Sequence, residues 1–131
     1  MSAELGGGPG TEELDLAIYI GDITFDVAHP RVMAEFWAAA LHYEIQEVTT
    51  TWAAVVDPRG LRPRCCFQHV STPRAGKNRV HLDLYTPGME AEVERLEKLG
   101  AKRLKSGEED GVRWTVMLDP EGNEFCVQPP P

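Results

Sequence analysis

Two short runs of alternating polar and apolar residues carry the side chains that could do chemistry. In each run every second residue is a carboxylate, a hydroxyl, a phenol or an imidazole. These polar residues are Asp22, Thr24 and Asp26 in the first run and His81, Asp83 and Tyr85 in the second. Because successive strand residues point to opposite faces, each run predicts a strand with one polar and one apolar face. If the two halves of the chain pair symmetrically, the polar faces converge on one cleft, a common form of small-molecule pocket.

The polar faces suggest acid–base chemistry. We expect repulsion among Asp22, Asp26 and Asp83 to raise at least one carboxyl pKa, and the negative field to raise the pKa of His81. An imidazole beside carboxylates can act as a general acid near neutral pH. His81 with Asp22 or Asp83 is therefore one catalytic hypothesis. The alternative is that these faces meet bulk water and line no pocket.

A sequence repeat indicates how the two runs are positioned. The pattern W-x4-D-P-x-G occurs at 52–60 and at 114–122, with the same offset for both landmarks (114 − 52 = 62 and 119 − 57 = 62). In each copy an apolar strand leads into an Asp-Pro-x-Gly turn, in which Pro presets φ and Gly permits positive φ. Trp52 and Trp114 take equivalent places, and we expect both to pack in the core or at the pocket rim.

The flanks of the two copies match as well, so each half is expected to contain a strand, a helix and then three strands. This predicts an α+β fold of two βαβββ modules, which form a curved mixed sheet with a central cleft and helices on the outer face. Thr86 is a candidate N-cap of the second helix and Gly100 its C-terminal stop. The expected lead strands are 18–27 and 80–85, the helices 30–41 and 87–99, the last strands 64–70 and 123–128, and the modules about 16–70 and 79–128.

The remaining segments are expected to be irregular. We expect a disordered tail at 1–14, a single domain at 15–128 and a short tail at 129–131. A polar connector is expected at 71–79. Segment 105–113 contains two glycines and is expected to be a mobile loop.

Composition indicates which partners are unfavourable and in which cellular compartment we expect the protein. The chain has 131 residues and a net charge of −8, which argues against nucleic acid as a partner. We find no signal peptide and no apolar run long enough to span a membrane. The three cysteines, Cys65, Cys66 and Cys126, make a poor disulfide framework, and the adjacent pair is expected to be buried in the core. These features favour a reducing compartment, and we expect a cytoplasmic protein.

The patterns resemble the vicinal oxygen chelate superfamily, and within it the glyoxalase-like domain proteins of the glyoxalase, bleomycin resistance and dioxygenase type. The resemblance covers about residues 16–128. It is carried by K-N-R-V-H-L-D-L at 77–84, by D-P-E-G-N-E-F-C-V at 119–127 and by A-E-F-W at 34–37. It implies a sheet curled around a cleft, and His29 stands where such proteins often have an N-capping Asp before the helix.

In the metal-dependent members that the resemblance brings in, four side chains hold one divalent ion, one from the lead strand and one from the last strand of each module. Carried over position by position, the four places fall on Asp22, Gln68, His81 and Cys126. Only His81 matches the usual His or Glu well, and the four together suit no single first-row ion. Glu124, two residues before Cys126 on the same strand face, is a further candidate ligand.

We therefore expect a protein that binds a small organic molecule in the cleft without a classical four-ligand metal site. One alternative is a metal-dependent lyase, isomerase or dioxygenase that uses a divalent ion with His81 and Asp22. Others are the metal-free acid–base enzyme and an interaction module without a ligand. The resemblance also implies a homodimer. The candidate ligand-binding residues are Asp22, Thr24, Asp26, Trp52, Gln68, His81, Asp83, Tyr85, Trp114 and Cys126.

Overall fold

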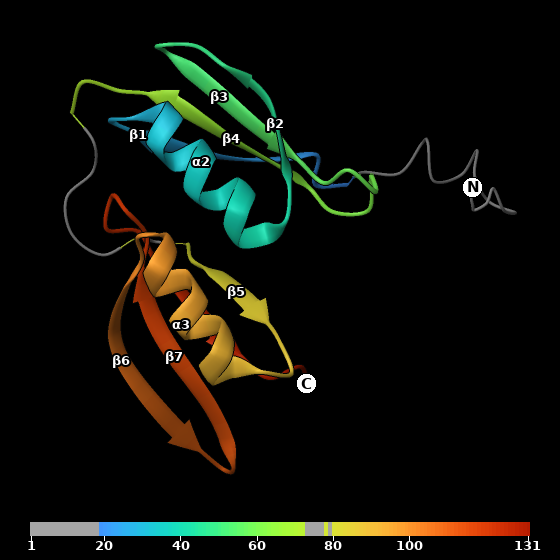
Figure 1. Cartoon of the computed structure of the whole chain (residues 1–131), viewed down its shortest axis with the longest axis vertical. Helices are drawn as coiled ribbons and strands as arrows, with labels where there is room; N and C mark the ends of the chain where they lie inside the picture. Colours follow the sequence, from blue (N-terminus) through green and yellow to red (C-terminus); the bar gives the residue numbers. More distant parts are fainter. Residues whose placement is uncertain (1–18, 73–77, 79) are drawn as a thin grey trace, which may run out of the picture.

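A computed structural model describes residues 19–72, 78 and 80–131, which form two modules with the same order of elements (Figure 1). The expected two-module α+β fold is confirmed. The elements of the first module are β1 (Asp22–Val27), α2 (Pro30–Leu41), β2 (Glu44–Val48), β3 (Trp52–Val56) and β4 (Arg64–His69). Those of the second are β5 (Leu82–Tyr85), α3 (Met89–Leu99), β6 (Lys102–Glu109), β7 (Val112–Leu118) and β8 (Glu124–Gln128).

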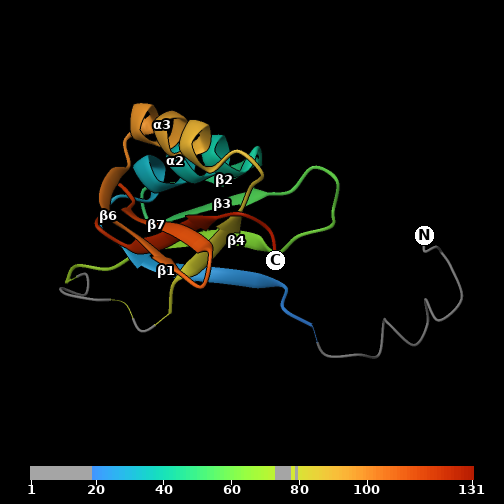
Figure 2. The same ribbon diagram turned by 90° about the horizontal axis from the view of Figure 1, so that it is seen from below.

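The two sheets have the same topology. Their strand orders are β1-β4-β3-β2 and β5-β8-β7-β6. In each sheet the lead strand runs parallel to the last strand, and the other pairs are antiparallel. Figure 2 shows α2 and α3 next to each other on one side of the strands, and the two helices are in contact. Neither helix is long and apolar enough to cross a membrane.

One hydrophobic core joins the modules. Trp37 of α2 is 1% exposed, and its ring lies 5.0 Å from that of Phe125 in β8 and 5.1 Å from that of Phe36. Helix α3 adds Val93 and Leu96 to the same core. Edge-to-face aromatic pairs of this kind stabilise a core beyond the area they bury. The modules therefore share one interior.

Polar contacts from the second module hold both ends of α2. At its start, the Glu121 carboxylate accepts hydrogen bonds from the backbone N–H groups of Ala28 (2.8 Å) and His29 (2.7 Å). At its end, the Arg95 guanidinium donates to the carbonyls of Ala39 and Ala40. His29 makes no side-chain cap, as its residue type suggested. Glu121 satisfies the backbone donors there instead, and its negative charge suits the positive end of the helix.

The two Asp-Pro-x-Gly turns are each organised by a buried aspartate. The Asp57 carboxylate accepts hydrogen bonds from the backbone N–H groups of Arg59, Leu61 and Arg62. The Asp119 carboxylate accepts from Glu121 and Asn123, and also from the Trp37 indole at 3.1 Å. The second turn is therefore fastened to the core of the first module, and it presents Glu121 to α2.

Some local expectations were wrong. Helix α3 begins at Met89 with Gly88 as its N-cap, and the Thr86 hydroxyl accepts the N–H of Gly88 instead of capping the helix. Segment 105–113 is the β6–β7 hairpin, because Asp110 (φ 54) and Gly111 (φ 79) form the kind of two-residue turn that closes such hairpins. The tail at 1–14 lies outside the described residues, as do 73–77 and 79 of the connector.

The adjacent cysteines behave as expected. Cys65 and Cys66 are buried free thiols, and Cys126 is a partly buried one. Burial raises the pKa of Cys65 to about 12 and also raises the pKa values of Cys66 and Cys126. At neutral pH the three side chains are therefore neutral thiols.

Replacing Glu121 tests the junction between the modules. Glu121→Ala removes the carboxylate that accepts the backbone N–H groups of Ala28 and His29, just before α2, and loss of such hydrogen bonding costs about 1 kcal/mol. We expect urea unfolding to show a decrease of that size in the free energy of unfolding. Glu94→Ala, on the exposed face of α3, serves as the control and is expected to leave it unchanged. Equal stability of both variants would contradict the capping role.

Acid unfolding tests the first turn. Hydrogen bonds from Arg59 lower the pKa of Asp57 to about 2, whereas an unfolded chain keeps it near about 4. A lowered folded-state pKa contributes stability above pH ~4 that is lost as the pH falls toward ~2. We expect the Tm of Asp57→Asn to fall less over this range than that of the wild type or of Asp110→Asn, measured by circular dichroism. A parallel fall in all three proteins would contradict this.

Candidate functional site

The lead strands present the polar faces that their alternation predicts. In β1, Asp22, Thr24 and Asp26 are exposed, and the residues between them are turned to the interior. In β5, Asp83 and Tyr85 are exposed and alternate with partly buried leucines. Both helices pack on the opposite side of the sheets, so this polar face is the side on which a ligand can approach.

The two polar runs approach each other at one end. Thr24 of β1 lies in the lining of a cavity of about 120 Å³ together with His81 and Glu124. Asn78 closes the cavity's edge, because its amide donates to the carbonyl of Glu124 and accepts the backbone N–H of the same residue. The structure therefore brings Thr24, His81 and Glu124 together.

Asp22 is held by an arginine. The Arg64 guanidinium donates two hydrogen bonds to its carboxylate, at 2.9 and 2.7 Å, and a third to the side chain of Gln46 at 2.8 Å. This hydrogen bonding lowers the pKa of Asp22, the opposite of the rise that repulsion among the aspartates would cause. The expected partnership of Asp22 with His81 is replaced by an ion pair within the first module.

Strand register identifies the counterparts across the repeat. Ala54 of β3, Cys66 of β4 and Thr24 of β1 form one row of paired residues. The corresponding row of the second sheet is Val116, Cys126 and Asp83. Both rows are fixed by the repeat, because Ala54 and Val116 each stand two residues after the Trp of their copy.

The register corrects one place in the ligand set. Cys66, and not Gln68, is the counterpart of Cys126. Gln68 lies one row further along, opposite Asp26 and Trp52. The loop before β4 is two residues longer than the loop before β8, because Cys66 follows Gly60 by 66 − 60 = 6 residues and Cys126 follows Gly122 by 126 − 122 = 4.

His81 belongs to a compact group of polar side chains. Its Nε2 lies 3.2 Å from a carboxylate oxygen of Asp83. The ligand atoms of His81, Asp83 and Cys126 lie within 4.8 Å of one another. His81 and Asp83 are half-exposed, which leaves the imidazole accessible. Of the two acid–base pairings expected from the sequence, the geometry supports His81 with Asp83.

The two repeat tryptophans occupy corresponding places beside the polar face. Trp52 pairs with Gln68, and Trp114 pairs with Gly107 across the β6–β7 hairpin. A Cβ atom on Gly107 would lie 2.4 Å from the Trp114 indole, so glycine is required for the ring to lie flat there. Both tryptophans are partly exposed and can offer a flat surface to a ligand.

The four positions of the metal-dependent arrangement do not fit a divalent ion here. The register puts Asp22 and Cys66 in the first module and His81 and Cys126 in the second. Arg64 occupies the carboxylate of Asp22 and adds a positive charge, while Cys66 is fully buried as a neutral thiol. A cation would have to displace the guanidinium and ionise the thiol.

The comparisons place the fold in a family. A sequence model described as Glyoxalase-like domain matches residues 22–128, most of the chain. The chain belongs to the glyoxalase-like domain family. The family resemblance drawn from the sequence is thereby confirmed. No curated protein matches this glyoxalase-like chain.

Solved structures share the glyoxalase-like fold at low sequence identity. A glyoxalase/bleomycin resistance protein/dioxygenase family enzyme from Burkholderia phytofirmans PsJN has a TM-score of 0.70 at 14% identity, covering 83% of this chain and 96% of that one. TnmS3, an antibiotic binding protein from Streptomyces sp. CB03234, has a TM-score of 0.66 at 16% identity, with coverages of 88% and 98%. A bleomycin-binding protein from Streptomyces verticillus, complexed with copper(II)-bleomycin, has a TM-score of 0.62 at 15% identity, with coverages of 88% and 99%.

Three residues of this site were missed by sequence reasoning. Arg64 was counted as the start of a strand, Cys66 as a core residue and Asn78 as part of a connector. For Cys66 the sequence offered no signal that separates it from Gln68, because both lie on the same face of β4 and the strand register decides between them. Nothing in the sequence pairs Arg64 with Asp22, which lies 42 residues away.

Removing Arg64 tests its hold on Asp22. In Arg64→Gln the Asp22 carboxyl loses its charged partner, so its pKa is expected to rise to the ordinary value of about 4. An NMR titration of the side-chain carboxyl carbon measures this rise. Arg113→Gln, on an exposed strand position, is the matched control. An unchanged Asp22 pKa in Arg64→Gln would show that the ion pair does not form in solution.

Proposed function

We propose that this glyoxalase-like protein binds a small organic molecule on the polar face of β1 and β5, without a four-ligand metal centre. The observation that carries the proposal is the Arg64–Asp22 ion pair. A guanidinium at the first ligand position replaces the charge that a divalent ion would supply, yet leaves the rest of the polar face open. The site thus retains groups that bind a ligand and lacks the set that binds the ion.

The side chains suggest what such a ligand carries. Thr24, Gln68 and Tyr85 offer hydroxyl and amide groups, and Asp26 and Asp83 offer carboxylates. A ligand with hydrogen-bond donors or a positive charge would satisfy these acceptors. Trp52 and Trp114 add flat surfaces on which an aromatic or heteroaromatic ring can stack. We therefore propose a polar, ring-containing molecule as the ligand.

Two structural neighbours support this class of function. TnmS3 is described as an antibiotic binding protein, and the protein from Streptomyces verticillus as a bleomycin-binding protein. Their likeness to this chain is one of fold. Together with the site chemistry, it favours binding of an antibiotic-like molecule over the lyase, isomerase and dioxygenase alternatives.

A second candidate function rests on the group His81, Asp83 and Cys126. Imidazole, carboxylate and thiolate are all ligands of Zn²⁺. A site built from the second module alone would need no contribution from Asp22. Metal-free acid–base catalysis by His81 with Asp83 draws on the same atoms. The metal alternative is separated from simple binding by the experiment below.

A homodimer remains part of the proposal. Several apolar side chains on strands and adjoining loops are largely exposed, and dimerisation would cover some of them. Light scattering coupled to size-exclusion chromatography measures the mass directly. A mass near 14.5 kDa would exclude the dimer. The exposed apolar residues include Ile45, Leu61, Val80, Tyr85 and Val112.

The binding experiment uses dialysed, untagged protein and a panel of aromatic and glycopeptide antibiotics that includes bleomycin. We expect a thermal-shift screen to give at least one ligand, whose affinity calorimetry then measures with and without excess EDTA. The affinity is expected to be the same in both. His81→Ala and Trp52→Ala are each expected to weaken it about tenfold, since each removes one favourable contact of roughly 1–2 kcal/mol. Arg113→Gln is the control.

Two outcomes would contradict metal-free binding. One is loss of binding in EDTA with recovery on adding Zn²⁺, which would support the group His81, Asp83 and Cys126 as a metal site. The other is stoichiometric metal found by elemental analysis of the untagged protein. An effect of Cys126→Ala on the recovered binding would then assign the thiol as a ligand.

A further inference from the structure

A second cavity lies at the end of α2 and is lined by residues of both modules. Its volume is about 580 Å³, within the range of small-molecule pockets. It opens between the loop after β3 and the segment that joins β5 to α3. Its strand residues come mostly from the helix-facing side and include Ile23, Leu82 and Leu84. The walls are therefore largely apolar.

Three arginines lie at the rim of this cavity, although the whole chain has a net charge of −8. Arg59, Arg62 and Arg95 all contribute to the lining. Arg59 is paired with Asp57, and Arg95 with Glu92. Arg62 forms no ion pair with any residue in 19–72, 78 and 80–131. Its charge is left for a partner outside this set.

Two carboxylates also lie in the lining. Glu92 is engaged by the guanidinium of Arg95 at 2.9 Å. Asp83 lies 3.2 Å from the imidazole of His81. Of the three arginines in the lining, Arg62 is therefore the one without an ion-pair partner in the described part of the chain.

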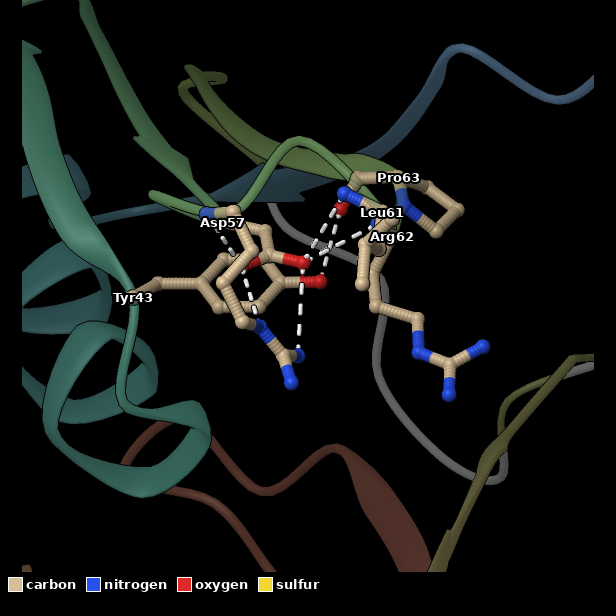
Figure 3. A network of polar contacts seen from close by, with 6 residues as sticks. Tyr43, Asp57, Leu61, Arg62 and Pro63 are labelled. Atoms are coloured by element: carbon tan, nitrogen blue, oxygen red, sulfur yellow. Dashed lines mark hydrogen bonds and ion pairs between the residues drawn. The ribbon is translucent and has the colours of Figure 1, made fainter. Parts of the chain in front are cut away.

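The loop that carries Arg62 is held in place. The backbone N–H of Arg62 donates to the Asp57 carboxylate at 3.1 Å, and the Tyr43 hydroxyl donates to the carbonyl of Pro63 at 2.9 Å. Figure 3 shows these bonds, with the Arg62 side chain extending away from them and its guanidinium joined to none of the residues drawn. The backbone at Arg62 is therefore fixed, and its guanidinium keeps all its donors for an anion.

The Asp-Pro-x-Gly turn of the second module carries a carboxylate at the position that Arg59 takes in the first module. In the second turn the residue two after the aspartate is Glu121, and its carboxylate binds the start of α2. In the first turn that position is Arg59, which lines the cavity together with Thr86, a residue that precedes α3. The first module therefore has no carboxylate equivalent to Glu121, which binds the start of α2 in the second turn.

We infer that this cavity binds the carboxylate of an organic acid with an apolar body. The carboxylate pairs with Arg62, and the apolar part packs against Ile23, Leu82 and Leu84. Arg and carboxylate groups form charge-assisted, often bidentate hydrogen bonds, which favours a planar carboxylate over a rounder anion. Asp83 and Tyr85 of the polar face also contribute to the lining, but Arg62 and the apolar walls do not belong to the polar-face site proposed above.

The test uses octanoate, with octanamide as its neutral counterpart, titrated into the full-length protein by calorimetry. We expect octanoate to bind and octanamide to bind at least about tenfold more weakly, because the amide lacks the charge. Arg62→Gln is expected to weaken octanoate about tenfold and to leave octanamide unchanged. Arg113→Gln, the matched control, is expected to bind octanoate as the wild type does.

NMR locates the site and keeps the two proposals distinguishable. With octanoate, shifts are expected at the backbone amides of Leu82, Leu84 and Tyr43, and the Arg62→Gln spectrum shows whether that variant is folded. Equal affinity for octanoate and octanamide, no binding of octanoate, or full affinity in folded Arg62→Gln would each overturn the inference. So would inorganic phosphate competing as well as octanoate. None of these outcomes affects the polar-face site, which is tested with antibiotics and His81→Ala.

Discussion

The structure depends on the hydrogen bonds between the second Asp-Pro-x-Gly turn and helix α2. Asp119 anchors the turn to the Trp37 indole, and Glu121 accepts the backbone donors at the start of α2. Burial raises the pKa of Asp119, and its hydrogen bonds to Asn123, Glu121 and Trp37 oppose that rise. The carboxylate is therefore stable only while this network is complete. That requirement fixes the second module against the first, and with it the positions of both lead strands.

The modules share one core on the helix side of the sheets. The polar residues of β1 and β5 therefore lie on the opposite side, which takes no part in that core. This separation lets the polar face vary without loss of the fold. Asp22 shows the result, since its carboxylate, at the first position of the metal-dependent arrangement, is engaged in an ion pair with Arg64. The family fold and the chemistry of its polar face are thus set by different residues.

The features that could be predicted from the sequence were those that rest on the internal repeat and on the alternation of polar and apolar residues. Two copies of one turn, at a constant offset, gave the module order, and α2 was predicted with its observed bounds, Pro30–Leu41. What escaped prediction depended on contacts between distant residues or on small differences in loop length. Examples are the pairing of Arg64 with Asp22 and the two-residue shift at β4. Local glycines were also misleading, because Gly107 makes room for an indole instead of loosening the chain.

The buried thiols have a consequence for how the protein meets reactive compounds. A cysteine attacks electrophiles and oxidants as its thiolate, and burial keeps Cys65, Cys66 and Cys126 protonated. A thiol held in its protonated form reacts slowly with such compounds. The three sulfur atoms then act as small apolar contacts. Electrophiles and oxidants that reach these side chains are therefore expected to leave them largely unmodified.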